Sequence, residues 1–446
     1  MRSTSRSTGT PSSEPNAPSE RVRHTARRRR RLAALGAVAL VAVPALATGP
    51  TAAARDHGPG PSAGSRPDGS VIWEWNATAM DVLTPSGRPL LTQPFVVTAM
   101  HVAMYDAVMA IEEHAEPFAT VVTAPLGASS EAAAATAAHR VLVGFLPEHA
   151  AVFDSALAES LAGVSDGPAE TAGVAVGEAA GWGTLASRLG DGTQSGPLPP
   201  ALPPGPGVWA PTPPAIAGLT PWLATATPYV LHAPDQFRPA PPPDIGSGRF
   251  RRALDELRRI GGATSTARTA EQTAIARFWA DQPITQGQRA LRAKAQALGG
   301  DIAQTARLFA AVMTSQADAI IACWDAKYTY QFWRPWQSVP TVEAAWTPML
   351  ATPNHPEYPS AHGCVTGSMA HALSAVLRTH RLDMDIDAAN VGVTRHYDTL
   401  EQLLDEVASA RIWGGLHYRF STETGLRLAE QVVHHNLRRN FRLVHG

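Results

Sequence analysis

The stretch that decides the fold reads His355-Pro-Glu-Tyr-Pro-Ser-Ala-His-Gly-Cys364. Its two prolines predict an extended approach, and the residues from 361 to 377 are compatible with a helix. Ser360 stands at the N-cap of that helix, so the backbone N–H groups of the first turn are free and the positive end of the helix dipole lies behind them. This pattern predicts an anion site in which His362 can donate a proton. The alternative is a capped helix after a proline turn, with His362 at the surface.

The composition favours an all-α protein. The chain has 446 residues, 44% of them hydrophobic, alanine is abundant and alternating β-branched runs are few. Apolar residues recur at helical spacing along most of the chain after residue 70, which predicts a single large α-helical domain at 71–446. Within it, the proline-dense segment 191–247 is predicted to wrap over the body or to form a lid. The helices of 251–446 are predicted to carry the oxyanion site. The periodicity predicts helices at 90–110, 129–144, 149–162, 167–188, 249–260, 269–280, 285–298, 301–330, 361–377, 400–410 and 422–438.

The N-terminal segment is predicted to be an export signal. Residues 27–31 are an unbroken run of arginine, and an apolar run from 32 to 47 follows it and ends in Ala-Leu-Ala. The apolar run is short for a membrane span and contains Pro44, although a retained anchor is an alternative. We therefore assign 1–47 to the signal and the Gly-, Pro- and Ser-rich 48–70 to a disordered linker, and we expect a secreted or extracytoplasmic protein.

Removal of the signal makes the chain acidic. Residues 1–47 contain nine arginines and two glutamates, so the total formal charge of −1 leaves about −8 on the rest. An acidic protein is a poor ligand for nucleic acid, and no stable membrane association is expected once the signal is removed. Any cationic pocket must then be a local arrangement of side chains.

Two further stretches in the last third of the chain bring cations towards the first. Lys327 and Arg334-Pro335 are seven residues apart, which predicts one helix face, and the aromatic residues between them predict burial. Arg411 and His417 flank paired glycines, which let the backbone turn closely around a ligand. Taken together, the three stretches supply a lysine, two arginines, a serine hydroxyl, helix-terminus amides and two histidines, a set that suits an oxyanion.

These motifs resemble those of the vanadium-dependent haloperoxidases and their relatives, the type 2 phosphatidic-acid phosphatases and bacterial acid phosphatases. That superfamily has Lys, six residues and Arg-Pro, then Pro-Ser-Gly-His, then Arg, five residues and His. The resemblance implies an all-α helical bundle of the vanadium haloperoxidase and acid phosphatase type. It also implies a bound vanadate cofactor. The residues that match are Lys327, Arg334, Ser360, Ala361, His362, Arg411 and His417.

The sequence departs from the superfamily pattern at two positions. Ala361 replaces a glycine, and because that residue acts through its backbone N–H, alanine can still donate. Ser421 stands where phosphatases have an aspartate that orients the histidine, and a serine can accept the imidazole N–H but adds no charge. The second departure favours vanadate ligation over phosphohistidine chemistry. The Phe278–Asp281 stretch also has a counterpart in haloperoxidases, and by resemblance Asp281 pairs with a vanadate-binding arginine.

By resemblance, His417 ligates the vanadium, and Lys327, Arg334, Arg411, Ser360 and the Ala361 amide hold the other vanadate oxygens. His362 serves as acid and base, and Lys327 polarises bound peroxide. The expected substrates are hydrogen peroxide, a halide and a small organic acceptor. His355 occupies a position that is histidine in bromoperoxidases and phenylalanine in chloroperoxidases, which favours bromide and iodide. A turn histidine is the alternative for His355.

Three questions stay open at the level of sequence. Cys323 and Cys364 can form a disulfide between two helices of the site or remain buried thiols. The chain can be a secreted acid phosphatase that acts through a phosphohistidine at His417 instead of a haloperoxidase. It can also be a non-catalytic protein that binds an oxyanion.

Overall fold

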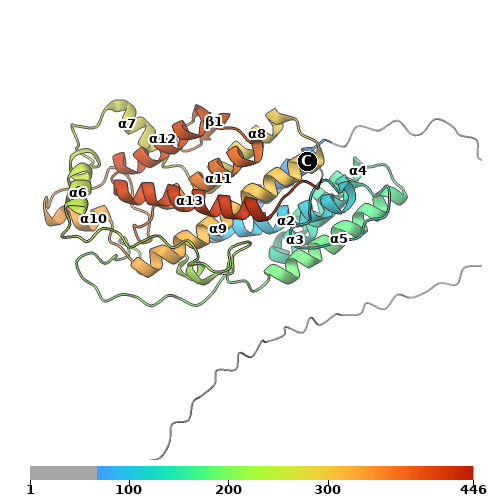
Figure 1. The fold of residues 1–446 in the computed structure, drawn as a ribbon, viewed down its shortest axis with the longest axis horizontal. Helices are drawn as coiled ribbons and strands as arrows, with labels where there is room; N and C mark the ends of the chain where they lie inside the picture. Colours follow the sequence, from blue (N-terminus) through green and yellow to red (C-terminus); the bar gives the residue numbers. More distant parts are fainter. Residues whose placement is uncertain (1–67, 445–446) are drawn as a thin grey trace, which may run out of the picture. The chain divides into compact units, whose positions relative to one another are not determined.

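The computed structural model describes residues 68–444, so the predicted export signal and most of the predicted linker lie outside the described residues. The regular structure of the described part is almost entirely helical, as the composition predicts (Figure 1). Its helices are α1 (Ser70–Leu83), α2 (Gln93–Glu112), α3 (Ser130–Phe145), α4 (Ala150–Ala162), α5 (Pro168–Arg188), α6 (Gly248–Ile260), α7 (Ala270–Phe278), α8 (Pro283–Leu298), α9 (Ile302–Tyr330), α10 (Pro335–Ser338), α11 (Ala361–Leu377), α12 (Leu400–Trp413) and α13 (Arg419–Arg439).

Helix α9 is the element that the other helices pack around. Asp301 begins it with a capping box, in which its carboxylate accepts from the Gln304 N–H, and Gln331 ends it in a left-handed conformation. The first half of α9 packs in one apolar core with α1, α2 and α3, and its second half packs in another with α11 and α13. Figure 1 shows α9 between these two groups of helices. The helix therefore joins the early part of the chain to the part that carries the predicted site.

Two helical stretches, Leu90–Glu112 and Ile302–Tyr330, are long and apolar enough to cross a membrane. In their most apolar windows, 89% and 94% of the residues are buried inside the protein. The apolar surface of both helices is thus used by the core of this domain.

The proline-rich segment 191–247 lies along the C-terminal half of α9. The Asp318 carboxylate accepts the main-chain N–H groups of residues 229–231, and the Trp324 indole N–H donates to the Leu219 carbonyl. Arg238 forms a bidentate ion pair with Asp325 at 2.6 and 2.7 Å. Side chains of the helix thus satisfy backbone groups of the segment that the prolines keep out of regular structure.

A β-hairpin is the departure from the all-α prediction in the described part of the chain. Strand β1 (Arg381–Ala388) pairs antiparallel with β2 (Val393–Thr399). Alternate residues of β1 are buried, and the strand packs on α8. The alternation of apolar and acidic residues in Leu-Asp-Met-Asp-Ile-Asp is the period-two signal of such a strand.

His101 in α2 is a buried histidine that should make the fold sensitive to acid. The Asn76 amide lies 2.8 Å from its Nε2, and burial, with a smaller contribution from Arg292, lowers the pKa of His101 to about 3. Because the pKa is lower in the folded than in the unfolded chain, the stabilisation is present above about pH 6.5 and is lost as the pH falls, at about 1.4 kcal/mol per pH unit. The free energy of unfolding can be measured with urea near pH 7 and again about one unit below pH 6.5. Between these two pH values the wild type should lose stability, and the His101→Gln variant should lose about 1.4 kcal/mol less than the wild type. Equal losses would contradict the prediction.

Candidate active site

Lys327 lies in the last turn of α9 with no exposed surface. Its ammonium group donates to three main-chain carbonyls of the loop before α11, those of Pro356 at 2.8 Å, Glu357 at 3.1 Å and Pro359. Burial lowers the pKa of Lys327 to about 8, with Arg334 adding to the effect. The carbonyls thus hold a buried cation against the loop that carries Ser360.

Arg334 also lies beside this loop, but the backbone between Lys327 and Arg334 does not continue the helix that their spacing predicts. Helix α9 ends at Tyr330, the chain reverses at Gln331 with φ of 40°, and Arg334 is the extended N-cap of α10. The prediction of one helix face for Lys327 and Arg334 is therefore wrong, because the left-handed residue ends the helix between them. Arg334 is nevertheless fully buried, as the flanking aromatic residues predict.

The Arg334 guanidinium is held by main-chain and imidazole groups. It donates from Nε to the His355 carbonyl at 2.9 Å and from Nη1 to the Leu416 carbonyl at 3.1 Å. Nη1 also lies 3.1 Å from Nε2 of His417, and Nη2 lies 3.0 Å from Nδ1 of His355. Burial lowers the pKa of Arg334 to about 10, although Glu357 opposes this effect. Arg334 thus connects the stretch from His355 to Cys364 with the turn that carries His417.

The start of α11 presents buried polar atoms without partners. Ser360 is the N-cap of α11, as predicted, but its hydroxyl makes no capping hydrogen bond. Among residues 68–444, no hydrogen bond is found for the Ser360 Oγ or the His362 Nε2, although both atoms are buried. Burial and the nearby Arg411 keep the pKa of His362 well below its usual value. His362 is therefore a neutral imidazole inside the site, not a surface residue.

Arg411 and His417 are brought together by the turn after α12. Gly415 has φ of 76°, and Leu416 and His417 donate their N–H groups to the Arg411 carbonyl. Arg411 donates from Nη1 to the Trp279 carbonyl at 2.6 Å, and its buried Nε has no partner in the described part of the chain. Burial lowers the pKa of Arg411 to about 9. Of the paired glycines, only Gly415 adopts the left-handed conformation.

Glu357 is a site residue that the sequence interpretation missed. Its carboxylate is fully buried, and Oε1 lies 2.8 Å from Nδ1 of His417 and accepts the Tyr418 N–H at 3.0 Å. Burial raises the pKa of Glu357 to about 7, against the opposite effect of Arg334 and Lys327. Ser421, which the sequence allows as an acceptor for the imidazole N–H, donates instead to the Glu357 main-chain carbonyl at 3.4 Å.

His355 lies at the side of the site. Its ring is 5% exposed, packs 5.2 Å from the Trp324 ring and contacts Arg334. Burial, followed by Lys327 and Arg334, keeps the pKa of His355 well below its usual value. Because the neutral His355 ring contacts Arg334, it can influence which ligand binds next to that arginine.

Asp281 does not pair with a site arginine, so that prediction is wrong. Its carboxylate binds Arg289 at 2.9 Å and accepts the Ala389 N–H, because the chain after α7 turns towards the hairpin. The contact between this stretch and the site is made instead by the Trp279 carbonyl, which accepts from Arg411. Because every residue has a main-chain carbonyl, the sequence gives no indication of this contact.

Cys323 and Cys364 are free thiols in the structure. Both are fully buried, and their sulfur atoms lie 2.6 Å apart between α9 and α11. The structure thus places the two cysteines side by side, as both states considered from the sequence allow.

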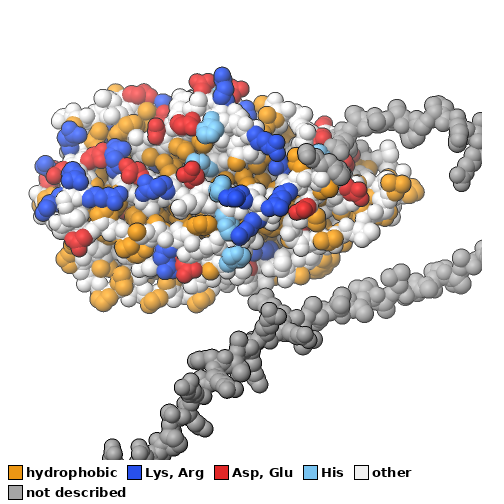
Figure 2. All heavy atoms as spheres, in the orientation of Figure 1, with side chains coloured by type: hydrophobic (Ala, Val, Ile, Leu, Met, Phe, Trp, Pro, Cys, Tyr) orange, Lys and Arg blue, Asp and Glu red, His pale blue; other side chains and the backbone are white. Residues whose placement is uncertain are grey.

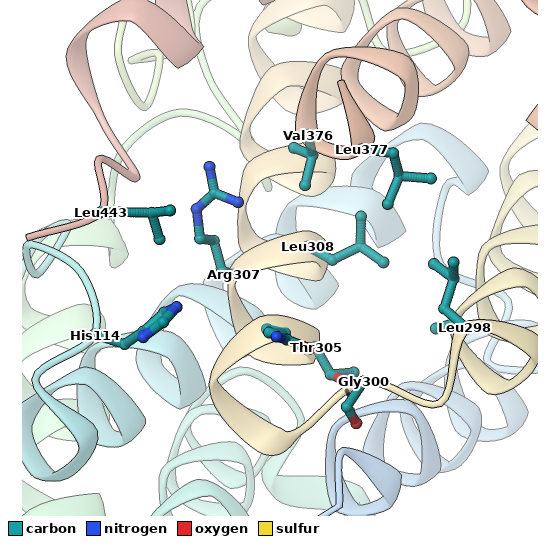
Figure 3. Close-up of a pocket in the computed structure, with 11 residues that line it drawn as sticks. His114, Leu298, Gly300, Thr305, Arg307, Leu308, Val376, Leu377 and Leu443 are labelled. Carbon is teal, nitrogen blue, oxygen red and sulfur yellow. Dashed lines mark hydrogen bonds between the residues drawn. The ribbon is translucent and has the colours of Figure 1, made fainter. Parts of the chain in front are cut away.

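The site is distinct from the surface features of the protein. Lys and Arg side chains are interspersed with Asp and Glu on the face seen in Figure 2. The cations of the site are buried and do not belong to the surface. A pocket of about 360 Å³ lies at the other end of α9, where Arg307 points among Leu308 and Leu443 (Figure 3). Arg307 precedes Lys327 by 20 residues, or about 30 Å of helix. This pocket is therefore remote from the convergent site.

Comparisons with known proteins agree with this arrangement. The family model described as the VCPO second helical-bundle domain matches residues 307–345 and 339–446. A bacterial vanadium-dependent iodoperoxidase structure has a TM-score of 0.73 and 24% identity, over 85% of this chain and 98% of the other. The chain has the vanadium haloperoxidase fold. Two structures of bacterial vanadium-dependent chloroperoxidase, one holo-type and one apo-type, each match 84% of this chain with 18% identity. The holo-type structure has a TM-score of 0.67 with 98% of its chain covered, and the apo-type structure has a TM-score of 0.66 with 99% covered. No curated protein matches the sequence.

The resemblance found in the three sequence stretches is thus confirmed for the vanadium haloperoxidase fold. Within this fold the predicted site residues come from four places in the chain: the end of α9, the start of α10, the loop before α11 with its first turn, and the end of α12 with the turn that follows it. The residues brought together are Lys327, Arg334, His355, Ser360, Ala361, His362, Arg411 and His417.

Proposed function

We propose that the protein is a vanadium-dependent haloperoxidase, which uses hydrogen peroxide to oxidise a halide. The observation that carries this proposal is the set of buried polar atoms without partners in the described chain: the Ser360 hydroxyl, the His362 Nε2 and the Arg411 Nε. The free amides at the start of α11 add to this set. Buried polar atoms are normally paired, so the presence of these unpaired atoms beside the site cations is consistent with a bound, partly protonated oxyanion.

The residues present fit vanadate. No group of three or more His, Cys, Asp or Glu side chains that could hold a metal ion occurs in residues 68–444. The donor set suits instead an oxyanion bound through one imidazole and several cations. His417 would ligate the metal through Nε2. Lys327, Arg334, Arg411, Ser360 and the Ala361 amide would hold the oxygens. Bound vanadate supplies Lewis acidity that activates peroxide.

The chain's own residues supply positioning and proton transfer. His362 is neutral, so its Nε2 can accept a proton when peroxide binds and return it when water or hypohalous acid leaves. The Lys327 ammonium group donates all three of its N–H groups to loop carbonyls, so it can polarise a bound oxygen through its charge and would donate to that oxygen by releasing one carbonyl. His355 contacts Arg334 at the side of the site, and we propose that it favours bromide or iodide. A small organic acceptor then receives the halogen.

A specific observation supports phosphate-ester hydrolysis as a second candidate. The argument against a phosphohistidine was the lack of a carboxylate at position 421, but Glu357 supplies a carboxylate to His417. An imidazole oriented in this way can attack a phosphoryl group.

The decisive experiment is an assay of both activities on one preparation. The protein is incubated with orthovanadate, and halogenation of an organic acceptor is followed with peroxide plus bromide, iodide or chloride. Hydrolysis of a phosphate monoester is measured without vanadate. We expect bromide- and iodide-dependent halogenation. Hydrolysis without halogenation would reject the haloperoxidase in favour of the phosphatase, and vanadate binding with neither activity would indicate an oxyanion-binding protein.

We further propose that the protein acts outside the cytoplasm. The support is the basic and apolar pattern of residues 1–47. N-terminal sequencing of the protein from the culture medium and from cells should find a mature chain that begins after the Ala-Leu-Ala at 45–47. An intact N-terminus in the membrane fraction would support a retained anchor instead.

Ser360→Ala should separate binding from stability. The Ser360 hydroxyl is buried and without a partner, so its removal should leave the free energy of unfolding without vanadate unchanged or slightly higher. The loss of one hydrogen bond to vanadate should weaken binding about tenfold, which titration calorimetry can measure. Ser368→Ala is the matched control, since this buried hydroxyl on α11 donates to the Val365 carbonyl at 3.0 Å. The control should lose about 1 kcal/mol of stability and keep its vanadate affinity; the reverse pattern would contradict the assignment.

A further inference from the structure

The His417 ring makes one hydrogen bond on each nitrogen, and together these fix its tautomer. The Arg334 guanidinium, 3.1 Å from Nε2, can only donate, so Nε2 must carry the lone pair. The proton of the neutral ring is then on Nδ1, which lies 2.8 Å from Oε1 of Glu357. This is the tautomer that a ligand histidine needs, because the lone pair is on Nε2, and a ligand there would take the place of the Arg334 hydrogen bond.

Glu357 is built into the site as an acceptor. It is fully buried, and the same oxygen that faces Nδ1 also accepts the Tyr418 N–H at 3.0 Å. These two contacts hold the carboxylate against both the ring and the backbone that follows it. Lys327 donates to the Glu357 main-chain carbonyl at 3.1 Å, which fixes the residue from the α9 side. The position of the carboxylate therefore depends on backbone contacts as well as on the ring.

We propose that Glu357 is the positioning residue of His417, and that it takes the part that an aspartate at position 421 has in related phosphatases. Ser421 lies near the Glu357 main chain and makes no hydrogen bond to the imidazole in the described chain. Glu357 orients the ring, keeps the proton on Nδ1 and raises the basicity of Nε2 towards vanadium. The vanadium part of this inference rests on the proposed function.

The test compares Glu357→Gln, Glu357→Ala and Ser421→Ala with the wild type. The first readout, without vanadate, is the nitrogen NMR spectrum of histidine-labelled protein, in which the two ring nitrogens of each tautomer differ. The second is the dissociation constant for orthovanadate, from titration calorimetry. Thermal unfolding shows which variants fold, and Glu357→Gln keeps the shape of the side chain if the alanine variant does not.

The wild type should show the Nδ1–H tautomer at His417. Glu357→Ala should give a mixture of tautomers and a dissociation constant higher by about 10- to 100-fold. Glu357→Gln should keep the tautomer, because its amide oxygen still accepts, but should bind vanadate more weakly because the charge is lost. Ser421→Ala should have the ring spectrum of the wild type and a dissociation constant within about twofold of it, a smaller change than the loss of one hydrogen bond would cause.

Two results would overturn the inference. One is a folded Glu357→Ala protein with the wild-type ring spectrum and vanadate affinity, which would leave Glu357 a purely structural role. The other is a Ser421→Ala protein that loses the tautomer and the affinity as much as the Glu357 variants do. If the wild type itself does not bind vanadate, the proposed function fails, and the ring spectrum still decides whether Glu357 sets the tautomer.

Discussion

His417→Ala should abolish halogenation and raise the dissociation constant for orthovanadate by more than about 100-fold, beyond the usual cost of losing only a supporting residue. The variant removes the proposed metal ligand, and it also leaves the Glu357 Oε1 and the Arg334 Nη1 without their imidazole contacts. Because both groups are buried, the protein should lose about 1–3 kcal/mol of stability as well. Activity, vanadate titration and urea unfolding on the same preparation separate the two effects.

The matched control is His434→Ala, which removes an exposed histidine of α13. This variant should keep the halogenating activity, the vanadate affinity and the stability of the wild type. A His417→Ala protein that halogenates at the wild-type rate would refute the ligand assignment. If it binds vanadate normally but does not halogenate, His417 has a catalytic role without ligation.

Gly415→Ala should cause the largest loss of stability among single-methyl changes in the site. The residue has φ of 76°, and an added Cβ would lie 2.3 Å from the Gly261 carbonyl oxygen and 3.0 Å from Pro348. The left-handed conformation costs about 1–2 kcal/mol for alanine, and overpacking against a rigid backbone adds about 1–3 kcal/mol. The expected loss is about 3 kcal/mol in urea unfolding. Because the turn joins Arg411 to His417, vanadate affinity should fall in the protein that remains folded.

Gly87→Ala separates the conformational part from the steric part. Gly87 has φ of 72°, close to that of Gly415, but an added Cβ there would meet no atom within 4 Å. This variant should lose only about 1–2 kcal/mol and should bind vanadate normally. Equal losses at the two positions would show that close packing at Gly415 contributes nothing.

Most helices could be predicted from the sequence because their signals are local. The capping residues Ser129, Ser247, Thr269 and Asp301 stand at or next to the predicted starts, and each accepts a backbone N–H of its own helix. The β1 strand has an equally local signal in its alternating residues. The chain-wide shortage of β-branched runs concealed it, since its apolar residues are Leu, Met and Ile.

The composition of the site could be predicted, but its contacts could not. The three motifs identify the cations and histidines, because an oxyanion site needs those residue types. The path of Arg334 depends on the left-handed Gln331, and glutamine has no strong preference for that conformation. Glu357 and His417 are 60 residues apart, and only the packing of the loop against the α12–α13 turn brings them together. The available signal is a glutamate between two prolines in a motif that contains no other carboxylate.

The carbonyls that hold Lys327 and Arg334 have a consequence for assembly of the holoprotein. Each cation has main-chain acceptors of its own, so neither requires a bound anion to compensate its burial. The polypeptide can therefore fold before it meets vanadate. We therefore expect the cofactor proposed above to be loaded into an already folded protein.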